Sequence, residues 1–274
     1  MHQGGSQSEF YSSKQETSSF FPLEQQQVFG NTFGEGMGDP ARYDAGNLRT
    51  NQLPFTQERV SHIDVKGGLN RDIGQMIADK KVIRAYSVVS PPWADHLEFL
   101  SIKNVGPLTN ELANIKEDDE LILLPKCTGT LRNTFLTEGG KRLVLLATGT
   151  GLAPFMSTIR DIDLIEAYEE IHLVHSVRDR DDLAYWYELL SVFEDEPDLH
   201  ELLKDKFEYT ALITGQGDPR IDARFIQADD RVMACGNLQF NYDVIQWCKD
   251  LGMTEGSNRE PGQFVIEKAF VDQT

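Results

Sequence analysis

A short apolar run followed by two glycines constrains the fold of this chain more than any other feature. Residues 142–147 are Arg-Leu-Val-Leu-Leu-Ala, which is too short to cross a membrane and suits a strand buried on both faces. Thr148-Gly149-Thr150-Gly151 follows, and Pro154 lies where a helix can begin without losing a hydrogen bond. Because glycine lacks a Cβ and the N–H groups of a helix start attract anions, this turn is suited to bind a phosphate. The same Gly-x-Gly pattern also occurs in ordinary tight turns.

Strands and helices alternate after residue 137, which predicts a parallel sheet covered by helices. Sheets of this kind bind ligands at the carboxyl ends of their strands. The glycine turn, Arg178 and Cys235-Gly236-Asn237 each follow an expected strand, so we expect the functional residues along one edge of the sheet. We expect strands at residues 142–147, 171–176, 207–212 and 231–234, and helices at 155–162, 183–193 and 242–251.

Residues 53–136 show short strand patterns separated by turn residues, which is typical of a β-barrel. Residues 1–52 are rich in Gly, Ser, Gln, Asn and Thr, and their aromatic residues follow no period, which predicts a disordered tail. In the barrel we expect strands at 59–65, 82–89, 97–103 and 121–124 and a helical turn at 109–115, with the second and third strands paired across their loop.

Charge and composition exclude several classes of function. A net charge of −18 argues against binding to nucleic acid or to anionic lipid, because both bind basic surfaces. No apolar run approaches the roughly 20 residues of a membrane helix, and the first residues do not resemble a signal peptide. The 3 cysteines are far apart in the sequence, so we expect no disulfide framework and no metal site. These features predict a soluble, cytoplasmic protein.

Four motifs in a fixed order identify a family resemblance. They are Arg84-Ala85-Tyr86-Ser87, Gly106-Pro107-Leu108-Thr109, the turn at 148–154 and Cys235-Gly236-Asn237. In this order and spacing they resemble the ferredoxin–NADP reductase superfamily, and the chain is most similar to the bacterial ferredoxin (flavodoxin)–NADP reductases over residues 74–274. The resemblance implies an antiparallel β-barrel that binds flavin (53–136), followed by an α/β domain with a parallel sheet that binds pyridine nucleotide (137–274) and ends in a tail covering the flavin.

The resemblance implies an FAD site in the barrel. In that family, the arginine at the position of Arg84 pairs with the FAD pyrophosphate, a role that suits the rigid, charged guanidinium with its several donors. Tyr86 would lie against the flavin ring, and the hydroxyl of Ser87 would bond to the flavin N5. Without the resemblance, these residues are consistent with a surface ion pair, a core tyrosine and an ordinary serine. The remaining implied FAD contacts are Ala85, Ser101, Ile102, Lys103, Gly106, Leu108, Thr109 and Phe270.

The resemblance also implies a nicotinamide nucleotide site in the second domain. Gly149, Thr150, Gly151 and Gly236 would receive the nucleotide, and Cys235 would lie beside the nicotinamide ring, although a cysteine in a strand is also consistent with a small core residue. The implied ligands of the 2′-phosphate are Arg178 and Arg220. The family has a further arginine after the position of Thr214, where this chain has Gly215, so NADPH is the expected nucleotide and NADH use stays open.

The implied activity is that of a monomeric flavoenzyme. It moves a hydride between NADPH and FAD and single electrons to or from ferredoxin or flavodoxin, with Tyr86, Ser87 and Cys235 as the catalytic residues. Docking of an acidic partner would require Lys80, Lys81 and Arg84 to lie on one face. The segment before Arg84 is shorter than in the family, which truncates the barrel unless part of residues 1–52 replaces the missing strand. A flavin reductase, and a nucleotide-binding or interaction protein with a degenerate barrel, are therefore alternatives.

Overall fold

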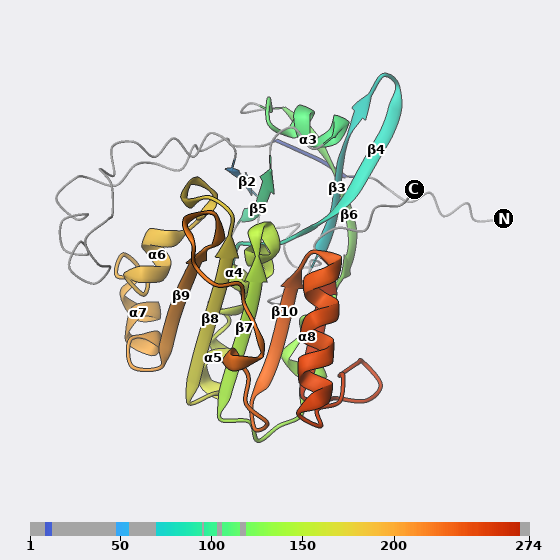
Figure 1. The fold of residues 1–274 in the computed structure, drawn as a ribbon. Coiled ribbons are helices and arrows are strands. Elements are labelled where there is room, and N and C mark those ends of the chain that lie inside the picture. Colours follow the sequence, from blue (N-terminus) through green and yellow to red (C-terminus); the bar gives the residue numbers. More distant parts are fainter. Residues whose placement is uncertain are drawn as a thin grey trace.

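The chain folds into an antiparallel part and a parallel part (Figure 1). The computed structural model describes residues 9–12, 48–54, 70–94, 96–102, 106–115 and 119–268. The antiparallel part has a four-stranded sheet in the order β1-β6-β3-β4 and a two-stranded sheet of β2 and β5. Its elements are β1 (Glu9–Ser12), β2 (Leu48–Pro54), β3 (Asn70–Ile77), β4 (Lys80–Ser87), β5 (His96–Ile102), α3 (Pro107–Leu112) and β6 (Glu120–Thr128). The strand expected at 59–65 lies outside the described residues.

The pairing of β4 differs from the expectation. β4 pairs along its whole length with β3, a strand that we did not expect. Within the expected strand 82–89, the pairing with β5 is the isolated bridge between Val88, just after β4, and Phe99. A two-residue turn joins β3 to β4, with φ of 47° at Ala78 and 60° at Asp79. Left-handed turns of this kind match the twist of neighbouring strands, so they favour the short hairpin over pairing across the longer loop.

Two strands come from the range that we expected to be a disordered tail. β1 pairs antiparallel with β6, and β2 pairs antiparallel with β5 along its whole length. Both partners would otherwise present unpaired N–H and C=O groups along an edge, which an extended segment of chain can satisfy. The expectation was therefore wrong for residues 9–12 and 48–52, while the rest of the range lies outside the described residues.

The parallel part is a five-stranded sheet in the order β11-β10-β7-β8-β9. Its central strand β7 has five consecutive residues, 143–147, that are fully buried, as the apolar run predicts. The expected strands are confirmed, but β11 was expected only as part of the C-terminal tail, and it instead pairs with β10 at the sheet edge. The strands are β7 (Arg142–Thr148), β8 (Glu170–Val177), β9 (Phe207–Ile213), β10 (Arg231–Gly236) and β11 (Phe264–Lys268).

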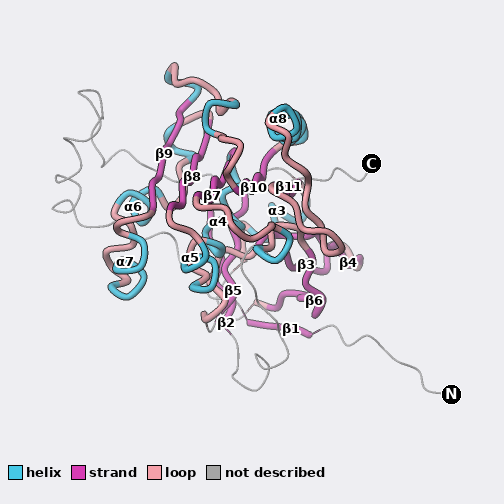
Figure 2. Tube along the Cα trace, turned by 90° about the horizontal axis from the view of Figure 1, so that it is seen from below, coloured by secondary structure: helices cyan, strands magenta, loops and turns pink. Residues whose placement is uncertain are grey.

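Helices cover both faces of this sheet, each over its own core (Figure 2). The α-helices are α4 (Ala153–Thr158), α5 (Ile162–Ala167), α6 (Trp186–Leu190), α7 (Pro197–Leu203) and α8 (Leu238–Asp250), with short 3₁₀ turns at η2 (Asn133–Phe135), η3 (Gly149–Leu152), η4 (Arg180–Asp182), η5 (Thr214–Gln216) and η6 (Ala223–Phe225). α4 to α7 pack on one face through residues such as Phe155 and Leu203, and α8 packs on the other through Phe240 and Val244.

The helices differ from the expectation in number and in bounds, and α3 and α8 begin earlier than expected, at Pro107 and Leu238. The helix expected at 155–162 is split, because the carboxylate of Asp161 caps a new helix, α5, by accepting from the N–H of Asp163 at 3.2 Å. α6 begins only at Trp186, after Tyr185 with a φ of 55°, and α7 was not expected. No helix in the described ranges is long and apolar enough to span a bilayer.

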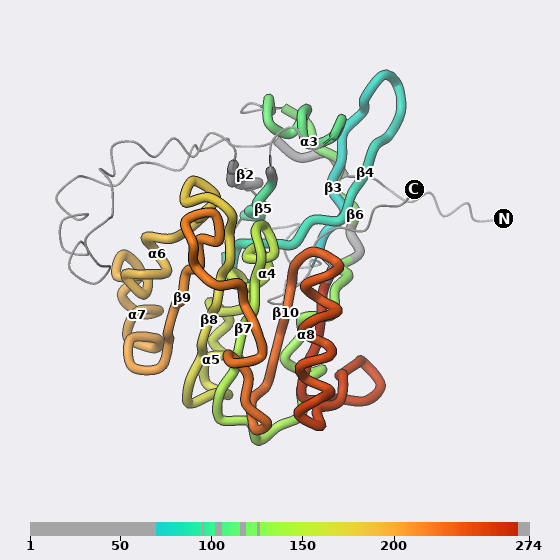
Figure 3. Tube along the Cα trace, viewed as in Figure 1, coloured from blue at the N-terminus to red at the C-terminus, as the bar shows by residue number. Residues whose placement is uncertain are grey.

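The antiparallel part lies next to the carboxyl ends of the parallel strands (Figure 3). Contacts between the two parts include the end of β11, where Glu267 bonds to Asn70 and Thr130. The edge formed by the carboxyl ends of the parallel strands, where we expected the functional residues, therefore faces the antiparallel part.

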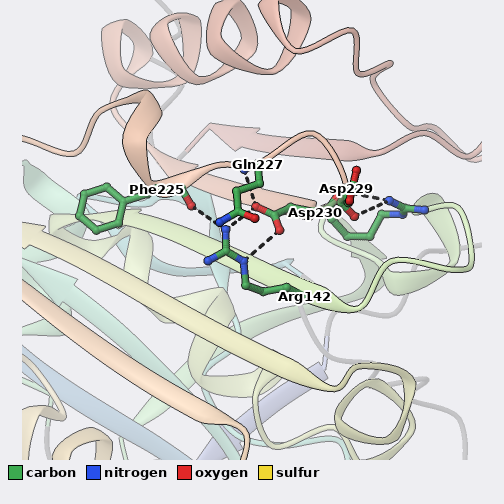
Figure 4. A network of polar contacts seen from close by, with 6 residues as sticks. Arg142, Phe225, Gln227, Asp229 and Asp230 are labelled. Atoms are coloured by element: carbon green, nitrogen blue, oxygen red, sulfur yellow. Dashed lines mark hydrogen bonds and ion pairs between the residues drawn. The ribbon is translucent and has the colours of Figure 1, made fainter.

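A buried polar network lies at the amino ends of the parallel strands, opposite to the edge with the candidate residues (Figure 4). The carboxylate of Asp230 accepts from Arg142 Nε at 2.9 Å and Nη2 at 2.7 Å, and from the backbone N–H of Gln227 at 2.6 Å. This ion pair raises the pKa of the Arg142 guanidinium. The network ties the start of β7 to the loop before β10, away from the candidate site.

Candidate functional site

The glycine turn lies at the end of β7 and forms the 3₁₀ turn η3, followed by the six-residue helix α4. Gly149 has a φ of 53°, and a Cβ placed on it would meet no atom within 4 Å. A Cβ on Gly151 would lie 2.1 Å from the carbonyl oxygen of Cys235. We expected both glycines to admit a ligand; in the structure Gly149 borders open space, whereas Gly151 allows the turn to pack against β10. Thr150 between them is half-buried.

A buried histidine that the sequence analysis did not single out contacts this turn from the interior of the sheet. His175, on β8, is fully buried, and its Nε2 lies 2.9 Å from the carbonyl oxygen of Gly149. Its Nδ1 lies 3.3 Å from the hydroxyl of Tyr209 on β9. Burial lowers the pKa of His175 to about 4, so the ring is neutral at physiological pH. A histidine at the end of a buried strand, beside a glycine turn, was the available sequence signal.

Cys235 lies at the end of β10 with 1% of its surface exposed. Burial, and then the carboxylate of Glu267, raise the pKa of its thiol, which keeps it protonated. Cys235 pairs in register with Glu267 of β11 and with Ala147 of β7. The side chain is therefore a small neutral group at the carboxyl edge. A Cβ on the neighbouring Gly236 would lie 2.3 Å from Thr148 Oγ1, so this glycine lets β10 pass close to β7.

Tyr86 and Ser87 are the last two residues of β4, in the antiparallel part that faces this edge. Tyr86 is half-buried, and its ring meets Phe99 edge to face with 6.3 Å between centroids. Burial raises the pKa of Tyr86, and a hydrogen bond to Ser101 partly offsets this, so the phenol is neutral. The hydroxyl of Ser87 donates to Asn70 Oδ1 at 2.8 Å.

Glu267 joins the two sides of the site. It accepts from Asn70 Nδ2 at 2.9 Å through Oε1, and the N–H of Thr130 donates to its Oε2 at 2.5 Å. A path of two hydrogen bonds therefore runs from Ser87 through Asn70 to Glu267, which pairs with Cys235. Sequence reasoning missed Asn70, Thr130 and Glu267 as site residues. The only signal was the position of Glu267 in the C-terminal motif.

The other expected flavin contacts surround the antiparallel sheet. Arg84 and Ala85 are exposed, and Arg84 Nη1 donates to the carbonyl of Ile83 at 2.7 Å. At the start of α3, the Thr109 hydroxyl accepts from the N–H of Gly106 at 2.8 Å, so this side chain caps the helix. Leu108 is buried and Ser101 half-buried, and Ile102 ends β5. Lys103 and Phe270 lie outside the described residues.

The expected 2′-phosphate ligands lie in the loops after β8 and β9. Arg178 and Arg220 are exposed, whereas Arg224 is paired with Asp222 at 2.8 Å. The N–H of Gly215 donates to the carbonyl of Arg178 at 2.8 Å, and a Cβ on Gly215 would lie 2.5 Å from that oxygen. The two loops are thus joined backbone to backbone, which leaves no room there for an arginine in the present conformation.

This edge offers open space beside the backbone and exposed positive charge. The space beside Gly149 accommodates a ligand next to the backbone, and exposed guanidinium groups occur on both sides, at Arg84 and at Arg178. Within the ranges described, no three His, Cys, Asp or Glu side chains lie close enough to hold a metal ion.

Comparison with known proteins agrees with this arrangement. Residues 145–244 match the oxidoreductase NAD-binding domain family. Over 212 residues, 71% of this chain and 78% of the relative, the sequence is 39% identical to a flavodoxin/ferredoxin–NADP reductase of Rhodobacter capsulatus. The chain belongs to the ferredoxin (flavodoxin)–NADP reductase family. A ferredoxin–NADP reductase of Pseudomonas aeruginosa is 36% identical, with 80% of this chain and 92% of the relative covered.

A solved member of this family has the same fold. The ferredoxin–NADP⁺ reductase of Neisseria gonorrhoeae, determined with bound FAD and NADP, superimposes with a TM-score of 0.70 at 25% identity, covering 82% of this chain and 93% of that one. The resemblance inferred from the four motifs is confirmed, and so is the expected order of an antiparallel domain followed by a parallel α/β domain.

Proposed function

We propose that this chain is a flavoenzyme that transfers a hydride between NADPH and FAD and single electrons to or from ferredoxin or flavodoxin. One observation carries the proposal. The ends of β4 and β10, which hold the candidate flavin and nicotinamide residues, are linked through Glu267: its carboxylate bonds to Asn70, the partner of Ser87, and its backbone pairs in register with Cys235. A hydride can pass only between groups held a few ångströms apart, and a direct link between the two sets of candidate residues supports such proximity.

Each side of the site would hold one cofactor. Arg84, Tyr86 and Ser87 would bind the pyrophosphate and ring of FAD, with the backbone at 101–103 and 106–109 completing the site. Gly149, Thr150 and Gly236 would bind NADPH, and Arg178 and Arg220 its 2′-phosphate. FAD, when bound, supplies the chemistry that converts a two-electron donor into single electrons.

The role of the protein's own residues is to bind the two cofactors and to orient them. Tyr86 is half-buried and Cys235 fully buried, and both are neutral, so neither places a charge at the site. Ser87 has its hydroxyl proton directed to Asn70, and Asn70 is held by Glu267, which fixes the orientation of the serine. We also propose a cytoplasmic location, which the buried thiols of Cys235 and Cys248, neither of them in a disulfide, support.

The visible spectrum of the purified protein tests this function. We expect a yellow protein whose flavin absorbance bleaches when NADPH is added without oxygen, because hydride transfer reduces the ring. A folded protein that stays colourless after incubation with FAD would contradict the proposal. If that protein still bound NADPH, it would support a nucleotide-binding protein instead. Comparing turnover with ferredoxin, flavodoxin and free FMN distinguishes the proposed enzyme from a flavin reductase.

The β3–β4 hairpin provides a surface for an acidic partner. Lys80 and Lys81 are exposed at the start of β4, and Met76, which pairs with Lys81 across the hairpin, is 57% exposed. Because side chains alternate along a strand, Lys80 and Arg84 lie on one face of the hairpin and Lys81 and Met76 on the other, so the three basic residues do not share one face and the two lysines flank the hairpin end. Interfaces often combine an exposed apolar residue with a basic rim, and basic groups speed the approach of an acidic partner. This local group of positive charges lies on a protein whose net charge is −18.

Reversing two of these charges is expected to slow electron transfer to the partner. In Lys80→Glu/Lys81→Glu, kcat/KM for ferredoxin should fall about tenfold or more at low salt, with the difference shrinking as salt is added. Reduction of ferricyanide by NADPH should not change, since a small acceptor does not need the hairpin. Lys249→Glu/Arg259→Glu, which changes the net charge by the same amount at two exposed residues away from the hairpin, is the matched control. An equal loss in the control, or no loss in the double variant, would exclude the hairpin as the docking surface.

A further inference from the structure

His175 connects the glycine turn to the interior of the sheet. Its side chain is 0% exposed and makes one contact from each ring nitrogen, 2.9 Å from Nε2 to the Gly149 carbonyl and 3.3 Å from Nδ1 to the Tyr209 hydroxyl. Gly149 lies in the turn η3 directly after β7, and Tyr209 lies on β9; β7 and β9 are the two strands that flank β8. The ring therefore lies between the turn and a tyrosine on the next strand.

The chemistry of the partners fixes the tautomer of this histidine. A backbone carbonyl can only accept a hydrogen bond, so Nε2 must carry the proton. Nδ1 then has a free lone pair and accepts from the Tyr209 hydroxyl. Because burial disfavours the charged ring, His175 stays neutral and keeps this single arrangement.

The hydrogen bond to Gly149 determines which way the next peptide faces. In a trans peptide the C=O and N–H groups point in opposite directions. Because the Gly149 carbonyl points inward to His175, the N–H of Thr150 points away from His175. A Cβ on Gly149 would meet no atom within 4 Å, so the turn also borders open space. Glycine has no Cβ to resist rotation, so without the histidine this peptide could flip and turn its carbonyl outward.

We propose that His175 is a positioning residue that locks the Gly149–Thr150 peptide with its N–H toward the pyrophosphate of the nicotinamide nucleotide. The inference rests on the proposed function, since it assumes that the turn receives that nucleotide. A flipped peptide would present a carbonyl dipole to an anion, and the lock removes this repulsion before the ligand arrives. The histidine itself does not touch the nucleotide.

The test compares two substitutions that introduce the same amide group on side chains of different length. In His175→Gln the amide nitrogen occupies the place of Nε2 and can still donate to Gly149, whereas in His175→Asn it is too short. We measure the Kd of NADP⁺ and of 2′-AMP by calorimetry, together with FAD content. We expect the asparagine variant to bind NADP⁺ about tenfold more weakly, the loss of one hydrogen bond to a charged group, and the glutamine variant to bind within threefold of wild type.

2′-AMP separates a positioning role from a general structural one. It carries the 2′-phosphate and adenine but no pyrophosphate, so its Kd should be unchanged in both variants. Equal NADP⁺ binding by the asparagine variant and wild type, or equal loss of both ligands in that variant, would overturn the inference. A wild-type protein that binds neither ligand would instead refute the proposed function, before any variant is compared. Tyr209→Phe, which keeps the ring and its Nε2 proton, should bind NADP⁺ within threefold of wild type; a tenfold loss there would count against the tautomer argument.

Discussion

Replacing Gly151 by alanine is expected to slow NADPH-driven flavin reduction at least about 100-fold, the effect of moving a binding group by about 1 Å. The added Cβ would lie 2.1 Å from the carbonyl oxygen of Cys235 and 2.7 Å from its carbonyl carbon. Both are backbone atoms of a buried strand that is paired with β7 and β11, so neither can move at low cost. The turn must therefore move away from β10, and the residues that would receive the nucleotide move with it.

Stopped-flow reduction of the bound flavin by NADPH measures this effect. Gly139→Ala is the matched control, because Gly139 has a φ of 88° with no atom within 4 Å of an added Cβ and lies before β7, outside the site. The control should lose about 1–2 kcal/mol of stability from backbone strain and keep its reduction rate. If Gly151→Ala reduced its flavin within threefold of wild type, the turn would tolerate the contact and the geometric argument would fail.

Replacing Asp230 by alanine is expected to lower the free energy of unfolding by about 3–5 kcal/mol, the usual cost of removing one partner of a buried ion pair. The side chain of Asp230 is 3% exposed and that of Arg142 22%, so the guanidinium would lose its partner where water reaches it poorly. The N–H of Gln227, which donates to the same carboxylate at 2.6 Å, would also lose its acceptor. Figure 4 shows that a single carboxylate serves both groups.

Urea denaturation of the flavin-loaded protein measures this loss. Asp222→Ala is the control, because Asp222 also pairs with an arginine, Arg224, but at the surface, with side chains 39% and 76% exposed. Surface pairs of this kind contribute about 0–1 kcal/mol. The Kd of NADP⁺ at low urea should not change in Asp230→Ala, since the network lies at the opposite edge of the sheet. A loss no larger than that of the control would show that the pair does not stabilise the fold.

The sequence predicts the parallel domain well because its signals are local. A strand buried on both faces, such as 142–147, must be continuously apolar, and a tight turn at its end must contain glycine, so both features are visible in a few consecutive residues. The same is true of the four motifs, which led to the correct family. The predicted helix bounds are less accurate. Asp161 starts a new helix through its side-chain cap, and the left-handed backbone of Tyr185 delays the start of α6, and periodicity reveals neither.

Contacts between distant segments were not predictable in this way. Strands β1 and β2 form because β6 and β5 offer them an edge, and their own composition is that of an unfolded tail. Asn70 and Glu267, which join the two sides of the site, are 197 residues apart. Gly151 was correctly singled out, but for a ligand rather than for the Cys235 carbonyl that it accommodates.

The sequence by itself determined the buried parallel strands, the glycine turn at their edge and the family to which they belong, since each depends on the residue types within a short window. Only the tertiary structure decided which groups meet at that edge: His175 beneath the turn, and Glu267 between Ser87 and Cys235. The physical reason is that a hydrogen bond depends on distance and direction in space, and neither is encoded in the spacing of residues along the chain.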